Sequence, residues 1–208
     1  MSNSSVSAVR SLARSIRYTP QRILHPLRRR RARERVMETV GPGSVLVLCH
    51  GNICRSPYAG ALLLGHLERP ARSRAVVSAG FILPGRTPPE HARAAAAGSA
   101  VDLSMHRSRV ISDDMVRDAE MILVMEPVQA RRIRSMFPWF EGPVLLLGDF
   151  DPGAIDTRTI RDPIDQSRAV FDEVYARIEA CCSEFAACEE RSGPPRERGP
   201  RDNAGSGS

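Results

Sequence analysis

The sequence has no lysine, a single tryptophan and only 5% aromatic residues. We attribute the absence of lysine to coding bias and draw no function from it. No apolar stretch approaches the ~20 residues that a membrane-spanning helix needs. The basic N-terminus also lacks the apolar core and the small-residue cleavage site of a secretory signal. We therefore expect neither a membrane-spanning nor a secreted protein, but a cytoplasmic one.

Cysteine does not occur in a pattern that would give a disulfide framework. The five cysteines are Cys49, Cys54, Cys181, Cys182 and Cys188. Because the number is odd and three of them fall in one predicted late helix, we expect a reducing compartment. Zinc is not expected, since Cys49 and Cys54 are five positions apart and no C-x2-C or H-x3-H pair occurs elsewhere. We predict no metal and no other cofactor.

Acidic residues are almost absent from the first 35 residues. Ten arginines occur there against Glu34 alone, so this segment has a net charge of +9. The net charge of the whole chain is +6, which leaves −3 for the remainder. We expect a basic, Arg-rich extension at 1–42, one domain at 43–190 and a tail at 191–208. The tail is rich in Gly, Pro, Ser and charge, which predicts disorder.

Three roles for the basic extension remain open. Apolar residues from Val6 to Ile16 repeat at helical spacing, but Pro20 and Pro26 interrupt the pattern. A solvated, disordered arm is the favoured interpretation. Contact of residues 1–35 with an anionic membrane surface, at the inner face of the membrane, comes second. Non-specific nucleic-acid binding is the least favoured.

Short apolar runs alternate with helical patterns from residue 44 onward. Strands are predicted at 44–48, 75–78, 121–124 and 144–147, and helices at 87–98 with Thr87 as N-cap, at 127–136 and from about 166. This alternation is typical of an α/β domain whose parallel sheet is flanked by helices on both faces. In such sheets, sites form at the carboxyl ends of the strands, where the loops after Leu48 and Leu147 meet.

The loop at residues 49–57, CHGNICRSP, joins a predicted strand to a predicted helix. Unpaired backbone N–H groups and the positive helix end point into such a loop and make it an anion cradle. The same field favours the thiolate of Cys49, and Arg55 can clamp two oxygens of a tetrahedral oxyanion. The second loop offers four carboxylates that could face Cys49: Asp149, Asp151, Asp156 and Asp162.

CHGNICRSP resembles the signature loop C-x-G-N-x-C-R-S-P of the low-molecular-weight protein tyrosine phosphatases. Five further matches occur in the family's order: VSAG at 77–80, DLSMHRSR at 102–109, ILVME at 122–126, LLLGDFD at 145–151 and RDP at 161–163. The resemblance covers residues 44–188. It implies a four-stranded parallel sheet in the order 2-1-3-4. It also implies hydrolysis of phosphotyrosine monoesters in proteins through a cysteinyl-phosphate intermediate.

The resemblance assigns roles to individual residues. Cys49 would attack phosphorus, Arg55 would hold the equatorial oxygens, and Asp162 would act as acid and then as base. The rest of the loop would bind the phosphate group, and it comprises His50, Gly51, Asn52, Ile53, Cys54 and Ser56.

Supporting roles also follow from the resemblance. Ser78 and His106 align with residues that, together with Ser56, hold Asn52 in its conformation. The hydroxyl of Ser56 can donate to the sulfur of Cys49. In the family, the cysteine at the position of Cys54 can form a disulfide with the nucleophile and shield it from deeper oxidation.

The pocket wall departs from the family pattern. The residue after Asp-Pro is usually aromatic in the family and is Ile164 here. The variable loop after the VSAG strand often carries another aromatic residue in the family and here offers only Phe81, close to the strand end. The sequence therefore predicts an aliphatic wall and leaves the strictness of phosphotyrosine preference open. Ile53 favours the tyrosine class, because members that act on phosphoarginine tend to have threonine there.

Two alternative functions remain. Arsenate reductases share the fold and the signature loop, but their thioredoxin-linked type needs two further cysteines after the third strand. Residues 118–140 contain no cysteine. A non-catalytic phosphoprotein-binding module is the other alternative, and the intact set of Cys49, Arg55 and Asp162 argues against it.

Overall fold

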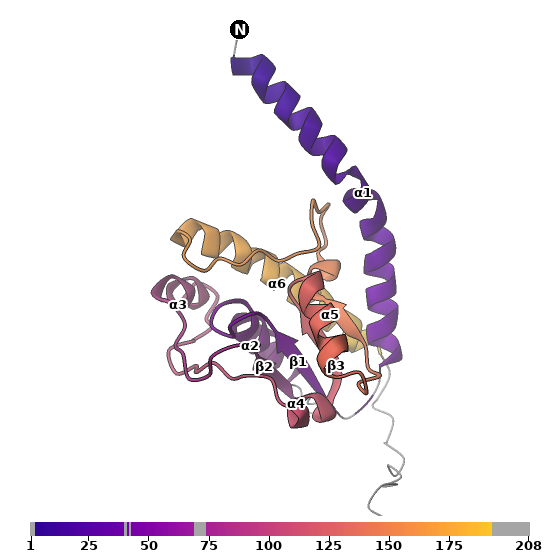
Figure 1. Cartoon of the computed structure of the whole chain (residues 1–208), viewed down its shortest axis with the longest axis vertical. Helices are drawn as coiled ribbons and strands as arrows, with labels where there is room; N and C mark the ends of the chain where they lie inside the picture. The colour runs from indigo at the N-terminus through magenta and orange to yellow at the C-terminus, as the bar shows by residue number, and fades with distance from the viewer. Residues whose placement is uncertain (1–2, 40, 42, 69–73, 193–208) are drawn as a thin grey trace, which may run out of the picture.

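The computed structural model describes residues 3–39, 41, 43–68 and 74–192, with side chains from residue 20 onward. Figure 1 shows a central sheet enclosed by helices, and one long helix at the N-terminus that stands along the side of this body. The predicted disordered tail lies outside the described residues, apart from positions 191 and 192.

Four parallel strands form the sheet. They are β1 (Ser44–Leu48), β2 (Val76–Ala79), β3 (Ala119–Val124) and β4 (Val144–Leu146). Their order is β2-β1-β3-β4, which confirms the predicted order 2-1-3-4. In the register, Leu48 at the end of β1 pairs with Ala79 of β2 and Val124 of β3. The carboxyl ends of the three strands therefore lie together at one edge of the sheet.

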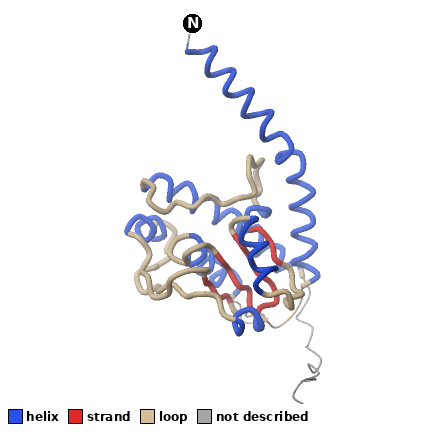
Figure 2. The backbone as a smooth tube through the Cα atoms, in the orientation of Figure 1, coloured by secondary structure: helices blue, strands red, loops and turns tan. Residues whose placement is uncertain are grey.

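Helices cover both faces of this sheet (Figure 2). Because strand side chains alternate, Val45 and Val47 join one hydrophobic cluster while Leu46 and Leu48 join the other. The first cluster includes residues of α2 (Arg55–Leu67), α3 (Glu90–Ala97) and α6 (Arg168–Arg191). The second includes residues of α4 (Asp113–Asp118) and α5 (Pro127–Met136).

Helix α1 (Asn3–Glu38) occupies most of the basic extension. The interpretation of this segment as a disordered arm is wrong for its C-terminal half, which packs against α6 and the 3-10 turn η1 (Leu147–Phe150). Ala32 and Val36 are buried there. Interior prolines cost a helix about 3 kcal/mol each, and α1 nevertheless continues through Pro20 and Pro26. The N-terminal half projects away from the body (Figure 1).

Helix ends differ from the predicted ones in two places. α3 begins at Glu90 with Pro89 as its N-cap, so the prediction of Thr87 in that role is wrong. The short helix α4 was missed, although the hydroxyl of Ser112 accepts a hydrogen bond from the Met115 N–H, as an N-cap does. In the described part of the chain, no helix is both long and apolar enough to cross a membrane.

Candidate active site

The CHGNICRSP loop connects the end of β1 to the first residue of α2. A small cavity of about 60 Å³ opens above it. The residues around this cavity are Cys49, His50, Gly51, Ile53, Cys54, Ile82, Arg86, Asp162 and Ile164. The predicted nucleophile, the predicted acid and most of the predicted loop residues therefore meet in one place.

Asn52 holds the loop in an unusual backbone conformation. Its φ is +51°, in the left-handed region that asparagine tolerates better than most residues. Its amide Nδ2 donates to the hydroxyls of Ser56 at 2.9 Å and Ser78 at 3.1 Å. Its Oδ1 accepts from the backbone N–H of Arg109 at 2.9 Å. The side chain thus ties the loop to the end of β2 and to the segment after residue 106.

His106 supports the same residue from the other side. Its Nε2 lies 2.8 Å from the carbonyl oxygen of Asn52, and because a carbonyl only accepts, Nε2 carries the proton. Burial lowers the pKa of His106, and the hydrogen bond to Asn52 opposes this only in part. The imidazole is therefore neutral at neutral pH. Ser78 and His106 both contact Asn52.

The sulfur of Cys49 receives two donors. The backbone N–H of Asn52 points to it at 3.3 Å, and the hydroxyl of Ser56 lies 3.1 Å away. The Ser56 hydroxyl also lies 3.3 Å from the carbonyl oxygen of Ala79, so its single proton can be donated to only one of the two at a time. Donors aimed at sulfur stabilise negative charge there.

Gly80 allows the loop to rest directly on the end of β2. A Cβ at this position would lie 2.8 Å from the backbone nitrogen of Asn52 and 2.9 Å from the carbonyl oxygen of His50. Any larger residue would therefore push the loop away. The carbonyl of His50 also accepts from the N–H of Phe81 at 2.8 Å, which fixes this contact.

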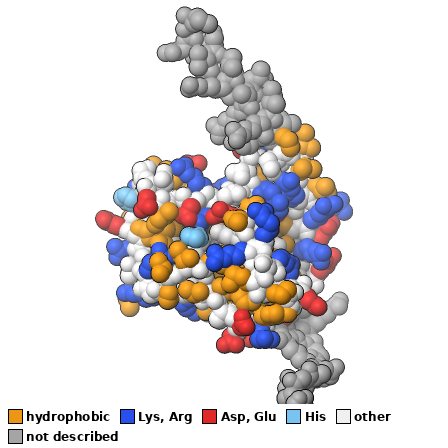
Figure 3. Space-filling model, in the orientation of Figure 1, with side chains coloured by type: hydrophobic (Ala, Val, Ile, Leu, Met, Phe, Trp, Pro, Cys, Tyr) orange, Lys and Arg blue, Asp and Glu red, His pale blue; other side chains and the backbone are white. Residues whose placement is uncertain are grey.

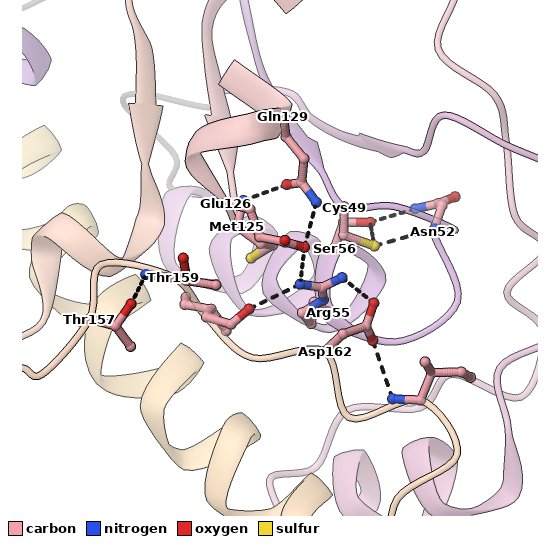
Figure 4. Close-up of polar contacts among 12 residues, drawn as sticks. Cys49, Asn52, Arg55, Ser56, Met125, Glu126, Gln129, Thr157, Thr159 and Asp162 are labelled. Atoms are coloured by element: carbon pink, nitrogen blue, oxygen red, sulfur yellow. Dashed lines mark hydrogen bonds and ion pairs between the residues drawn. The ribbon is translucent and has the colours of Figure 1, made fainter. Parts of the chain in front are cut away.

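The guanidinium of Arg55 is buried between two carboxylates (Figure 4). Its Nη1 donates to Glu126 Oε1 at 2.8 Å and to the carbonyl oxygen of Ile160 at 3.0 Å. Its Nη2 donates to Asp162 Oδ2. Arg55 therefore links the nucleophile loop to the end of β3 and to the loop that carries the predicted acid.

Glu126 and Gln129 were missed by the sequence reasoning. Gln129 Nε2 donates to Glu126 Oε1 at 3.0 Å, while Gln129 Oε1 accepts from the backbone N–H of Met125 at 2.9 Å. These bonds fix the carboxylate against Arg55 (Figure 4). A signal existed, because Glu126 ends the ILVME motif at the carboxyl end of β3.

Of the four carboxylates in the second loop, Asp162 is the one that borders the cavity. Its Oδ1 accepts from the backbone N–H of Ile164 at 3.2 Å, which orients the carboxylate. The other three pair with arginines elsewhere: Asp149 with Arg158, Asp151 with Arg177 and Asp156 with Arg22.

Cys54 lies next to Arg55 and is buried. Burial raises the pKa of its thiol well above the ordinary value, and the nearby Cys49 and Asp162 add to the effect. Cys54 is therefore a thiol at neutral pH. The remaining cysteines, Cys181, Cys182 and Cys188, are buried in α6, and all five are free.

The wall of the cavity is aliphatic, and one cation completes it. Ile53, Ile82 and Ile164 supply the apolar side chains. Arg86 was not foreseen from the sequence, and its Nη2 donates to the carbonyl oxygen of Gly51 at 2.9 Å. Phe81 does not border the cavity but packs into the core.

Among the described residues, no group of three or more His, Cys, Asp or Glu side chains is arranged to hold a metal ion. Arg86 is the arginine on the cavity wall, while the buried Arg55 does not line the cavity but pairs with Asp162, which does, and α2 begins at Arg55. This arrangement can bind an oxyanion beside a sulfur nucleophile and a carboxylic acid.

Comparisons with known proteins agree with this geometry. The sequence model described as "Low molecular weight phosphotyrosine protein phosphatase" matches residues 44–192. The chain is 34% identical over 153 residues to the low molecular weight protein-tyrosine-phosphatase Wzb of Salmonella typhimurium, covering 73% of this chain and 97% of Wzb. It is 35% identical over 137 residues to the probable phosphatase AmsI of Erwinia amylovora, covering 65% and 90%.

Solved phosphatase structures share the fold of this chain. The tyrosine phosphatase AmsI of Erwinia amylovora superimposes with a TM-score of 0.63 at 34% identity, over 72% of this chain and 94% of that one. The arginine phosphatase YwlE of Geobacillus stearothermophilus superimposes with a TM-score of 0.62 at 27% identity, over 70% and 92%. The chain therefore belongs to the low molecular weight phosphotyrosine protein phosphatase family.

Proposed function

We propose that this protein hydrolyses phosphotyrosine monoesters in other proteins through a cysteinyl-phosphate intermediate, with the chemistry in a domain at residues 43–190. The observation that carries the proposal is the position of Cys49. Its sulfur accepts from Asn52 and Ser56 beside a cavity that Asp162 borders, next to the buried guanidinium of Arg55. The family membership supports the same chemistry.

In the first step, the Cys49 thiolate attacks phosphorus, so that a P–S bond forms as the bond from phosphorus to the tyrosyl oxygen breaks. Asp162, protonated in the enzyme–substrate complex, gives its proton to that oxygen and tyrosine leaves neutral. Arg55 and the loop amides, including those of His50, Gly51, Ile53 and Cys54, hold the equatorial oxygens.

In the second step, the Asp162 carboxylate takes a proton from water as the water oxygen attacks phosphorus. The P–S bond breaks, inorganic phosphate forms and Cys49 returns as thiolate. The hydroxyl of Ser56, 3.1 Å from the sulfur, donates to the departing thiolate and makes it a better leaving group.

Substrate binding must first separate Asp162 from Arg55, because the two are paired in the free protein. The phosphate dianion offers Arg55 a bidentate acceptor in place of one carboxylate oxygen. Asp162 is then free to approach the leaving oxygen. One guanidinium thus couples phosphate binding to the position of the acid.

The cavity wall supports an aryl phosphate over phosphoarginine as substrate. Ile53, Ile82 and Ile164 offer apolar contact to a phenyl ring. The Arg86 guanidinium on the same wall would repel the positive guanidinium group of phosphoarginine. The arginine phosphatase YwlE is similar in fold, so the fold alone does not decide between these two substrates.

The exposed side of α1 supports a cytoplasmic enzyme that contacts the inner face of the membrane. Ile23, Leu24 and Leu27 are exposed on this helix among its arginines. Apolar side chains beside basic ones favour an anionic lipid surface. Binding of the full chain to vesicles with and without anionic lipid tests this; equal binding to both would contradict it.

The central test is turnover of aryl phosphates. Cys49→Ser should abolish it, and an active Cys49→Ser protein would refute the mechanism. Asp162→Asn should slow esters with poor leaving groups most, because those need the proton. A loss of equal size for good and poor leaving groups would remove the acid role of Asp162.

A further inference from the structure

A groove of about 320 Å³ lies between α1 and β4, and we refer to it as the arginine groove. Four arginines and one aspartate line it: Arg28, Arg31 and Arg35 of α1, with Asp149 and Arg158 from the sheet side. Ala32 of α1 and the strand β4 form the rest of its wall. It shares no lining residue with the catalytic cavity.

Positive charge dominates the arginine groove. The one carboxylate, Asp149, is already paired with Arg158 at 2.7 Å. Arg28 donates to the neutral side chain of Gln21, and Arg31 has no acidic partner among residues 20–39, 41, 43–68 and 74–192. The guanidinium groups of Arg28 and Arg31 are therefore left to attract an anion. Figure 3 shows basic side chains gathered over the C-terminal half of α1.

Arg35 adds to this surplus of charge. Its carboxylate neighbour is Glu38 at 3.8 Å, and both side chains are 68% exposed. Such a pair contributes little stability and gives way readily to a stronger acceptor.

The shape of the arginine groove fits an extended chain. Arg28, Arg31 and Arg35 are spaced by three and four residues, so they share one helix face over about 10 Å. All three consecutive residues of β4 line the groove. Neighbouring side chains of a strand point to opposite faces of the sheet, so three consecutive residues can line one groove only through the backbone edge of the strand. β4 is the last strand in the sheet order, so among the described residues no strand lies beside this edge.

We propose that the arginine groove is a docking site for an extended, multiply phosphorylated segment of the substrate protein. The segment would add its backbone to the edge of β4 and direct its phosphates at the arginines of α1. Phosphate dianions match guanidinium groups through paired, charge-assisted hydrogen bonds. The proposal rests on the proposed function, because it supplies the phosphatase with a second contact to a phosphoprotein.

The groove is a feature of this chain's extension. The family match covers residues 44–192, whereas three of the four arginines lie at residues 28–35. Docking here therefore adds to phosphate recognition at Cys49 rather than restating it.

The test is a binding measurement that needs no turnover. The full chain carrying Cys49→Ser is titrated into a fluorescent eight-residue peptide with two phosphoserines separated by one residue, and into its unphosphorylated form. We expect the phosphates to tighten binding at least tenfold. Phenylphosphonate, chosen to compete with phosphate for the catalytic cavity, should not displace the peptide.

A matched pair of variants locates the site. Arg28→Gln with Arg31→Gln should weaken phosphopeptide binding at least tenfold. Arg30→Gln with Arg93→Gln removes the same charge outside the groove and should change it less than twofold. When Cys49 is left in place, both double variants should retain turnover of a small aryl phosphate.

Three results would overturn the proposal: no effect of phosphorylation, equal loss in both double variants, or displacement by phenylphosphonate. If Arg28→Gln with Arg31→Gln reduces binding to vesicles with anionic lipid and leaves peptide binding unchanged, the groove serves a membrane and the peptide assignment is wrong. Failure of the proposed function looks different: the unmodified chain would not turn over aryl phosphate, whatever the peptide does.

Discussion

Arg55 Nη1 lies 2.8 Å from Glu126 Oε1, so the arginine of the nucleophile loop is held by a carboxylate at the end of a different strand. Gln129 in turn fixes that carboxylate. The contact leaves Nη2 as the guanidinium arm that Asp162 binds. Glu126 thus determines the orientation of the Arg55 guanidinium.

Replacing Glu126 with glutamine should lower kcat/KM for an aryl phosphate about 10–100-fold, because an arginine that shifts by an ångström loses its alignment with the phosphate. Steady-state kinetics measures the effect. Glu141→Gln, at an exposed position remote from the cavity, is the control and should leave the kinetics unchanged. Unchanged kinetics in Glu126→Gln would contradict the positioning role.

Cys54→Ser should leave turnover within a few-fold but make inactivation by hydrogen peroxide irreversible. Peroxide converts the Cys49 thiolate to a sulfenic acid, and the neighbouring Cys54 thiol condenses with it to a disulfide and releases water. Without Cys54, further peroxide oxidises the sulfenic acid to a sulfinic acid, which dithiothreitol does not reduce. Recovery of activity after dithiothreitol treatment measures the difference. Cys181→Ala, in α6, should recover as the parent protein does. Full recovery of Cys54→Ser would argue against a protective disulfide.

Stability should fall as the pH drops below about 6.5, in part because of His106. Burial lowers its folded-state pKa, so the unfolded chain binds the proton first. The contribution of neutral His106 to the free energy of unfolding is therefore fully present above pH 6.5. It is lost as the pH falls toward the pKa of His106 in the folded protein. Urea unfolding at pH 7.5 and pH 5.5 measures it. His106→Gln can still donate to Asn52 but does not titrate, so it should show a smaller loss; an equal loss would exclude His106 as a cause.

The packing of α1 predicts a stability difference between two adjacent residues. Val36→Ala should lower the free energy of unfolding by about 1–3 kcal/mol, because Val36 is fully buried. Met37→Ala, at a position that is 38% exposed, should change it by less than about 0.5 kcal/mol. Urea unfolding of both variants is the measurement. Equal effects would mean that α1 does not dock on the body in solution.

Local sequence predicted the parts of the site that local chemistry controls. The strand–loop–helix pattern around Cys49 predicted the anion cradle, and Asp162 was among four candidate carboxylates. Glu126 and Arg86 could not be assigned in the same way, because their contacts with Arg55 and Gly51 arise only when distant segments meet. Strand order followed from the family resemblance rather than from periodicity.

The structure of the N-terminal extension could not be predicted from its composition. Two prolines and ten arginines favour disorder, and only tertiary contacts stabilise the helix there. Arg29 and Arg33 both pair with Glu184 of α6, and Ala32 and Val36 are buried. Helix propensity is a weak predictor where ion pairs and buried side chains decide whether a helix forms.

In the free enzyme, the Asp162 carboxylate occupies the position on the Arg55 guanidinium that a phosphate oxygen would take. Inorganic phosphate formed in the second step must compete with a carboxylate that is tethered beside the same guanidinium. The tether gives this carboxylate a high effective concentration, so it refills the position as soon as the product loosens. The same carboxylate must also be displaced by the substrate phosphate, so the ion pair weakens the binding of substrate and product alike.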